Sequence, residues 1–181
     1  MSAPSLAERV VALDDALDAV PHAFGGALAL AYYAEPRATV DIDLNLFVGT
    51  DRYAAVARPL GRLGAVVDDR VEALVQRDGQ VRVFWERTPL DLFFDYDPFH
   101  GAAAKRTKRV PFADTTIPIL AVEHLIVRKV IFDRAKDWVD IDAVLALDTP
   151  VDTAEVLRWV GRVAGDTDRR YDRIATVLTS R

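Results

Sequence analysis

The sequence predicts a mixed α/β core of about 120 residues, followed by a helical region of about 60 residues. Residues 40–48 alternate polar and apolar side chains with the period of a half-buried strand, and two more strand-like runs lie near 80–86 and 89–95. Toward the C-terminus, apolar residues recur at helical spacing instead. We therefore expect two domains, a core over 1–120 and a C-terminal helical region over 121–181.

A capping pattern predicts the first helix. Ser5 and Glu8 have the spacing of a capping box, and apolar residues follow at helical spacing to about residue 20. Gly25-Gly26 interrupts this helix, and the apolar run 27–33 predicts a second, buried helix.

The middle of the chain predicts strands after a further helix. Thr50-Asp51 begins a helix that reaches about Leu63, and residues 73–96 have the composition of strands, with Asp78-Gly79 as a hairpin turn. The other expected elements are a helical turn over 98–104, short strands near 110–112 and 117–119, two helices within 121–147, and two more beginning near Asp152 and Asp166.

The composition excludes several classes of protein. The chain has no cysteine, which excludes disulfides, thiolate metal sites and cysteine nucleophiles and suits a reducing compartment, so we expect a cytoplasmic location. The N-terminus lacks the pattern of a signal peptide, and no apolar run approaches the length of a membrane span. We expect no membrane partner.

The charge is unevenly distributed. The net charge of −5 argues against a simple cationic nucleic-acid binder. Residues 1–100, however, hold 9 basic and 16 acidic side chains, whereas residues 101–181 hold 14 and 12. The basic run 105–109 is either a solvated loop or edge strand, or part of a surface that holds a polyanion. The distribution therefore permits an RNA partner without requiring one.

Two carboxylates on one strand form the sharpest chemical feature. Asp41 and Asp43 are two residues apart, so their side chains project from the same face, about 6–7 Å apart. Such hard oxygen ligands bind Mg²⁺, which often also contacts substrate phosphates. Gly25-Gly26 lies at the start of a predicted helix, where backbone N–H groups can approach a phosphate. A metal site with a phosphate site is the minimum for phosphoryl or nucleotidyl transfer.

Asp91 extends this set. It interrupts an otherwise apolar strand-like run, where an unpaired carboxylate would be costly and a neighbouring metal site would explain it. The plainer alternative is that Asp91 points to solvent from an edge strand. The other two features also have plain alternatives, an exposed strand face for Asp41 and Asp43 and an ordinary turn for the glycine pair.

These motifs resemble a known superfamily. The run from Phe24 to Ala27, followed by Asp41-Ile42-Asp43 and a later strand Asp, resembles the polymerase-β-type nucleotidyltransferases. The longer run from Arg37 to Asp43 is similar to the AbiEii-like and MenT-like nucleotidyltransferases, the toxin halves of toxin–antitoxin pairs. A later helical motif of these families matches Lys129, Arg134, Lys136-Asp137 and Asp140. Ala27 departs from the pattern, because many members have a small hydroxyl residue there that contacts phosphate.

The resemblance, which spans about residues 22–147, implies a polymerase-β-like core with a mixed sheet, followed by a C-terminal helical bundle. It also implies that Asp41, Asp43 and Asp91 hold two Mg²⁺ ions, with Asp91 placed to help deprotonate the attacking hydroxyl. By the same resemblance, Gly25 and Gly26 cradle the triphosphate of the NTP.

Four further roles come from the resemblance. Lys129 and Lys136 would contact phosphates or stabilise the leaving pyrophosphate, which makes them catalytic as well as nucleotide-binding residues. Arg37 and Thr39 would flank the nucleotide site. Thr39 either supports the bend through its hydroxyl or, if the protein is controlled by phosphorylation, is the residue modified, since a phosphate near Asp41 would repel the triphosphate.

We therefore predict a Mg²⁺-dependent nucleotidyltransferase that moves NMP from an NTP to an RNA acceptor, the tRNA 3′ end, and so blocks translation as a toxin. Its partner would be a cognate antitoxin protein. Transfer to a small molecule or to a protein side chain is an alternative. A catalytically inactive nucleotide-binding or partner-binding domain is another, which the presence of all three carboxylates disfavours.

Overall fold

The computed structural model describes residues 4–147 and 149–180. They form two compact units. The sheet unit contains the chain up to Leu28 together with Ala38–Leu120, and the helical unit contains Ala29–Arg37 and the chain from Ala121 onward. The segment between Leu28 and Ala38 thus belongs to the helical unit, although it lies within the N-terminal half of the sequence.

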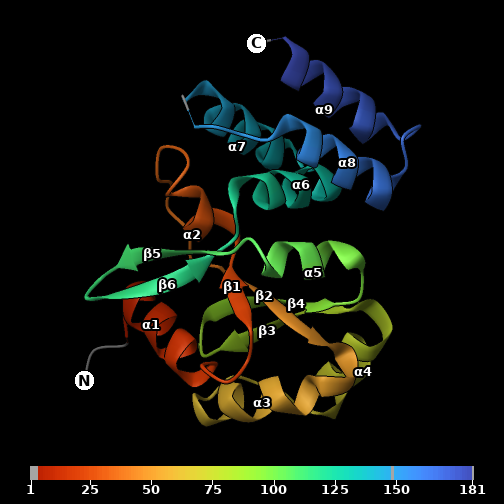
Figure 1. The fold of residues 1–181 in the computed structure, drawn as a ribbon. Coiled ribbons are helices and arrows are strands. Elements are labelled where there is room, and N and C mark those ends of the chain that lie inside the picture. The colour runs from red at the N-terminus through yellow and green to blue at the C-terminus, as the bar shows by residue number, and fades with distance from the viewer. Residues whose placement is uncertain (1–3, 148, 181) are drawn as a thin grey trace. The chain divides into compact units, whose positions relative to one another are not determined.

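The sheet unit is built on six strands in the order β3-β4-β2-β1-β6-β5 (Figure 1). The strands are β1 (His22–Phe24), β2 (Ile42–Gly49), β3 (Gln80–Trp85), β4 (Thr88–Asp95), β5 (Lys108–Phe112) and β6 (Thr115–Ile119). The sheet is mixed, since β2 pairs with β4 and β1 with β6 in parallel, whereas the other neighbours are antiparallel. The predicted fold class is therefore confirmed. The three-residue strand β1, which the sequence analysis missed, joins the two halves of the sheet.

Helices cover both faces of this sheet. They are α1 (Leu6–Ala16), α3 (Tyr53–Arg62), α4 (Asp69–Asp78) and α5 (Pro98–Ala104), and a 3₁₀ turn over Thr50–Arg52 leads into α3. Figure 1 shows α1, α3 and α4 on one side of the sheet and α5 on the other. The predicted capping box is confirmed, because Ser5 Oγ accepts from Glu8 N at 3.2 Å and Ser5 N donates to Glu8 Oε2 at 2.7 Å.

The prediction of strands from residue 73 is wrong for its first part, since 69–78 is helix α4. Asp68 begins this helix, because its side chain accepts hydrogen bonds from the backbone N–H groups of Arg70 and Val71. Gly79 ends it in the left-handed conformation, with φ of 67°. Asp78-Gly79 is therefore a helix C-terminus rather than a hairpin turn. The two strands expected near 80–86 and 89–95 are confirmed as β3 and β4.

The helix expected over 27–33 is shorter than predicted. Helix α2 covers Gly26–Leu30, and the chain leaves it through a turn in which Ala34 N donates to Leu30 O at 2.9 Å. The helix spans the boundary between the units, since Leu28 belongs to the sheet unit and Ala29 to the helical unit.

The helical unit contains four further helices, as predicted. They are α6 (Val122–Phe132), α7 (Ala135–Ala146), α8 (Thr153–Ala164) and α9 (Arg169–Thr179). Asp152 caps α8 by accepting from Glu155 N at 3.0 Å. Trp138, Trp159 and Ile174 are buried among these helices. Within the described residues, no helix has the length and apolar character to span a membrane.

Candidate active site

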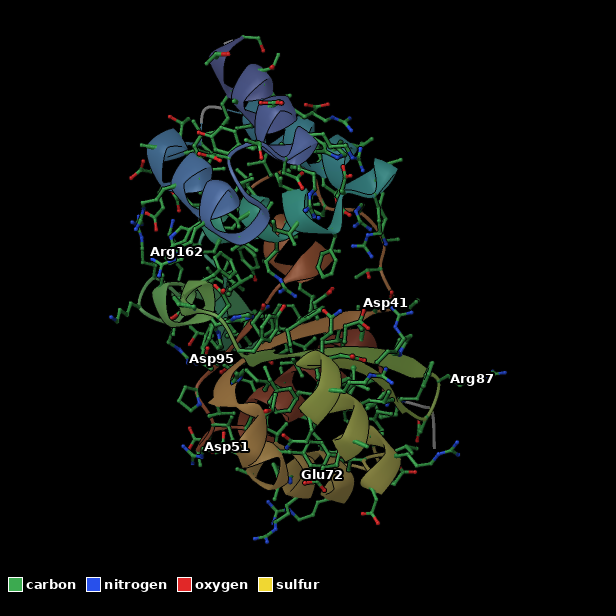
Figure 2. All side chains as sticks on the ribbon, turned by 90° about the vertical axis from the view of Figure 1, so that its right-hand side faces the viewer. Asp41, Asp51, Glu72, Arg87, Asp95 and Arg162 are labelled. Carbon is green, nitrogen blue, oxygen red and sulfur yellow. The ribbon has the colours of Figure 1, made fainter. Side chains whose placement is uncertain are left out.

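Strand register brings the predicted carboxylates together in the sheet unit. Asp43 lies directly opposite Asp91 across the parallel β2–β4 pair, and Ile42 lies opposite Leu90. Neighbouring strands are about 4.8 Å apart and side chains alternate between faces, so Asp43 and Asp91 share one face at close range. Asp41, two residues before Asp43, extends the set along β2. Figure 2 shows Asp41 at the opposite end of the strands from Asp95, which ends β4.

These carboxylates are partly accessible. The Asp41 side chain is 31% exposed and that of Asp91 is 20% exposed. Strand β4 lies between β3 and β2, so the alternative that Asp91 points to solvent from an edge strand is wrong. Such a setting lets a small ion or a phosphate reach the oxygens while the apolar neighbours Leu90 and Leu92 stay buried.

Arg82 is a residue of this cluster that the sequence analysis missed. It lies on β3 directly opposite Asp91, to which it donates from Nε at 2.8 Å and from one terminal nitrogen at 2.7 Å. The same terminal nitrogen donates to Asp41 Oδ2 at 3.2 Å. The hydrogen bond to Asp91 raises the pKa of the Arg82 guanidinium, although partial burial opposes this, so the group stays charged.

The glycine pair is packed against the carboxylate strand. Gly25 N donates to Asp43 O at 2.9 Å. Gly26 has φ of 53°, and a Cβ there would lie 1.8 Å from Asp43 Oδ2. Only glycine therefore fits at position 26 without moving the Asp43 carboxylate. The close approach supports the prediction that the glycine turn and the carboxylates form one site.

Asn45 is a second residue that the sequence analysis did not single out. It is 3% exposed, and its Nδ2 donates to Ala23 O at 3.4 Å across the β1–β2 pair. A Cβ on Gly25 would lie 2.7 Å from that nitrogen. The Asn45 amide therefore fills the space beneath the glycine turn, where a larger residue than glycine would displace it.

Thr39 fixes the chain that enters β2. Its hydroxyl accepts from Asp41 N and donates to Asp41 O, both at 3.2 Å. These two bonds match the predicted role of supporting the bend. Its modification by phosphate stays a prediction.

Arg37 and Lys129 come together in the helical unit, in a network of charges with Asp140. Arg37 donates to both carboxylate oxygens of Asp140 at 3.0 Å, and Lys129 Nζ donates to Asp140 Oδ2 at 2.6 Å. Lys129 Nζ also lies 3.8 Å from Asp137 Oδ1, and Arg134 donates to Asp137 at 2.7 Å. The later helical motif, apart from the exposed Lys136, is thus an ion-pair cluster.

The charged side chains at the centre of this network are buried, so the loss of one partner would destabilise the fold. Lys129 and Asp140 are 4% and 3% exposed. Burial raises the pKa of Asp140, but the hydrogen bonds from Arg37 and Lys129 outweigh it and leave that pKa below its ordinary value. Lys129 therefore has a structural partner in this unit, and its predicted contact with phosphate remains untested.

The carboxylates of the sheet unit fit Mg²⁺ in their chemistry. The donors are carboxylate oxygens on adjacent strands, which is the ligand type that this ion prefers. In the described part of the chain, no three acidic or histidine side chains are gathered into a metal-binding cluster. A cation already lies at this position, however, because the Arg82 guanidinium bridges Asp41 and Asp91.

A protein-family model described as "Nucleotidyl transferase AbiEii toxin, Type IV TA system" matches residues 10–179. No curated protein matches the chain.

Two solved structures of ANT(2″)-Ia are similar in fold. The solution structure of this antibiotic-resistance factor has a TM-score of 0.54 at 16% identity, and the match covers 96% of this chain and 91% of that chain. The crystal structure in complex with adenylyl-2″-tobramycin has a TM-score of 0.54 at 17% identity, and the match covers 96% of this chain and 97% of that chain. An antigenic nucleotidyltransferase-like protein from Paracoccidioides brasiliensis has a TM-score of 0.48 at 14% identity, and the match covers 99% of this chain and 89% of that chain.

Gly26→Ala should abolish nucleotidyl transfer, because the new Cβ would collide with Asp43 Oδ2. The left-handed backbone adds about 1–2 kcal/mol of destabilisation. Gly165→Ala is the matched control, since Gly165 has φ of 99° and a Cβ there would meet none of the described atoms within 4 Å beyond its own chain neighbours. We expect the control to lose stability in thermal unfolding but to keep its activity. Full activity of Gly26→Ala would contradict the close packing of the two motifs.

Thr39→Val should lower activity about tenfold, because it removes the hydroxyl that fixes Asp41 and costs about 1 kcal/mol of stability. Thr39→Ser keeps the hydroxyl and should keep most of the activity. Steady-state transfer rates and thermal unfolding measure both effects. Equal rates for the two variants would show that the bend does not depend on this hydroxyl.

Asp140→Asn should reduce the free energy of unfolding by about 3 kcal/mol, because it leaves Lys129 buried without its closest carboxylate. The pKa of Asp140 is lowered in the folded state, so its contribution is present above pH about 4 and is lost as the pH falls. Urea unfolding from pH 7 to pH 3 should show the wild type and the variant converging. The exposed Asp142→Asn on the same helix is the control, and a loss of similar size there would contradict the account.

Proposed function

The chain belongs to the AbiEii family of nucleotidyl transferase toxins of type IV toxin–antitoxin systems, and on that premise we propose that it transfers NMP from an NTP to the 3′ end of tRNA. The observation that carries the proposal is the register of β2 and β4, which sets Asp43 beside Asp91 with Asp41 on the same face. Transfer of this kind to tRNA would block translation. The exposed basic run 105–109, part of which lies on the edge strand β5, supports a polyanionic acceptor.

Asp41, Asp43 and Asp91 would hold Mg²⁺. When bound, Mg²⁺ neutralises triphosphate charge and favours ionisation of the acceptor hydroxyl. Asp91 would accept the proton of the acceptor hydroxyl while the oxygen of that hydroxyl forms a bond to the α-phosphorus. The bond between the α-phosphorus and the bridging oxygen breaks, and pyrophosphate leaves.

Gly25 and Gly26 would bind the triphosphate through the backbone, because the absence of side chains allows a close approach. Asn45 would hold this turn in place from below. Arg37, Lys129 and Lys136 are proposed as phosphate contacts by family resemblance. The exposed Lys136 offers the clearest test, since Lys136→Ala should lower transfer without lowering stability.

A small-molecule acceptor is the second candidate. The fold likeness to ANT(2″)-Ia, which was crystallised with adenylyl-2″-tobramycin, supports it. An aminoglycoside offers a hydroxyl acceptor without phosphates, so this candidate does not use the basic run.

One assay separates these candidates. The protein is incubated with Mg²⁺ and each labelled NTP, together with total RNA in one arm and an aminoglycoside in the other. We expect label on tRNA-sized RNA, with about a thousandfold loss in Asp41→Asn and no loss in the exposed control Asp69→Asn. Label on the aminoglycoside alone would favour the second candidate. Intact NTP binding with no labelled acceptor would contradict both.

Expression of the protein tests the proposed toxicity and the antitoxin partner. Growth arrest should require Asp41 and Asp43 and should be relieved by co-expression of the cognate antitoxin. Arrest that persists in the double variant Asp41→Asn, Asp43→Asn would contradict a catalytic origin of the toxicity.

A further inference from the structure

Arg82 reaches across three strands of the sheet. It begins on the edge strand β3, pairs with Asp91 on β4 through two hydrogen bonds, and extends to Asp41, the residue directly before β2. An ordinary cross-strand ion pair would end at its opposite neighbour. The reach to a second carboxylate makes Arg82 a bridging cation for the cluster.

Such a cation stabilises the carboxylate cluster when no metal is bound. Asp43 and Asp91 are directly opposite each other on one face, and like charges in that position destabilise a sheet. Arg82 supplies a compensating positive charge, and its planar guanidinium matches the two oxygens of Asp91.

We propose that Arg82 competes with the divalent metal for Asp91 and Asp41, and that it must leave these carboxylates when the metal binds. The inference rests on the proposed function of the carboxylates as metal ligands. Arg82 is then a positioning residue, since it holds Asp41 and Asp91 in place before the metal arrives and sets how tightly the metal binds.

Charge and access make this exchange feasible. A divalent ion and a guanidinium on the same oxygens repel each other strongly at separations of about 4 Å. The Arg82 side chain is 46% exposed on an edge strand, so water can solvate the guanidinium as soon as it swings away. Ion pairs between partly exposed side chains are weak, so a divalent metal can displace the guanidinium from them.

The test measures metal affinity directly rather than catalysis. Mn²⁺, which is paramagnetic, is titrated into the protein without nucleotide, and free Mn²⁺ is followed by electron paramagnetic resonance. Arg82→Gln removes the competing charge and should tighten Mn²⁺ binding about three- to tenfold, the range expected for loss of a charge-assisted contact. Arg82→Lys keeps the charge but not the planar fork, and should fall between the wild type and Arg82→Gln.

Arg87→Gln is the matched control. Arg87 follows β3 in the turn that leads to β4, is exposed, and projects outward in Figure 2. The substitution removes the same charge from the same hairpin without touching the carboxylates, so Mn²⁺ affinity should change by less than about twofold.

Thermal unfolding provides a second readout. Without metal, Arg82→Gln should unfold at a lower temperature than the wild type, because Arg82 then no longer offsets the repulsion between the carboxylates. With saturating Mn²⁺ the difference in unfolding temperature should narrow or reverse, since at one ligand concentration the variant that binds more tightly is stabilised more.

The outcomes separate this inference from the proposed function. Tighter binding in Arg82→Gln, abolished by adding Asp43→Asn, supports the competition. Unchanged or weaker binding in Arg82→Gln, with Asp43→Asn still abolishing it, overturns the competition and leaves the metal site intact. Mn²⁺ binding that is insensitive to Asp43→Asn in every variant overturns the competition and the proposed metal site together.

Discussion

The pairing of Asp43 with Asp91 across two parallel strands is the constraint on which the rest of the sheet unit depends. Carboxylates at directly opposite positions of neighbouring strands repel each other, so a nearby cation stabilises the folded sheet. Arg82 provides the cation from the neighbouring strand, and Gly26 leaves the space in which the Asp43 carboxylate lies. The site is therefore a local cluster of like charges whose repulsion a neighbouring cation offsets.

The helical unit uses the same residue types for a different purpose. Lys129 and Asp140 are buried together, and Arg37 completes the carboxylate's hydrogen bonds, so this cluster resembles a structural ion-pair network. In the sheet unit, the side chains of Arg82, Asp41 and Asp91 are partly exposed instead. Burial thus distinguishes the two charge clusters, although each has a cationic side chain between two aspartates, Lys129 in the helical unit and Arg82 in the sheet unit.

Much of this could be predicted from the sequence, because its signals are local. The alternation over 40–48 predicted strand β2 and the common face of Asp41 and Asp43, and the caps at Ser5 and Asp152 predicted two helix starts. The prediction of a hairpin turn at Asp78-Gly79 failed because the same dipeptide occurs both in hairpin turns and at helix C-termini. The helix N-cap at Asp68 distinguishes the two cases here. Arg82 and Asn45 were missed because their roles arise from neighbours in the sheet, which spacing along one strand does not reveal. No family motif marked them either.

The central claim is that these three carboxylates hold the metal and that Arg82 gives way to it. A crystal structure of the protein grown with Mn²⁺, analysed by anomalous diffraction at the manganese edge, tests this most directly. The account predicts an anomalous peak within coordination distance of Asp41, Asp43 and Asp91, with the Arg82 guanidinium no longer in contact with Asp91. An anomalous peak elsewhere, or one at this site with Arg82 still bonded to Asp91, would contradict it.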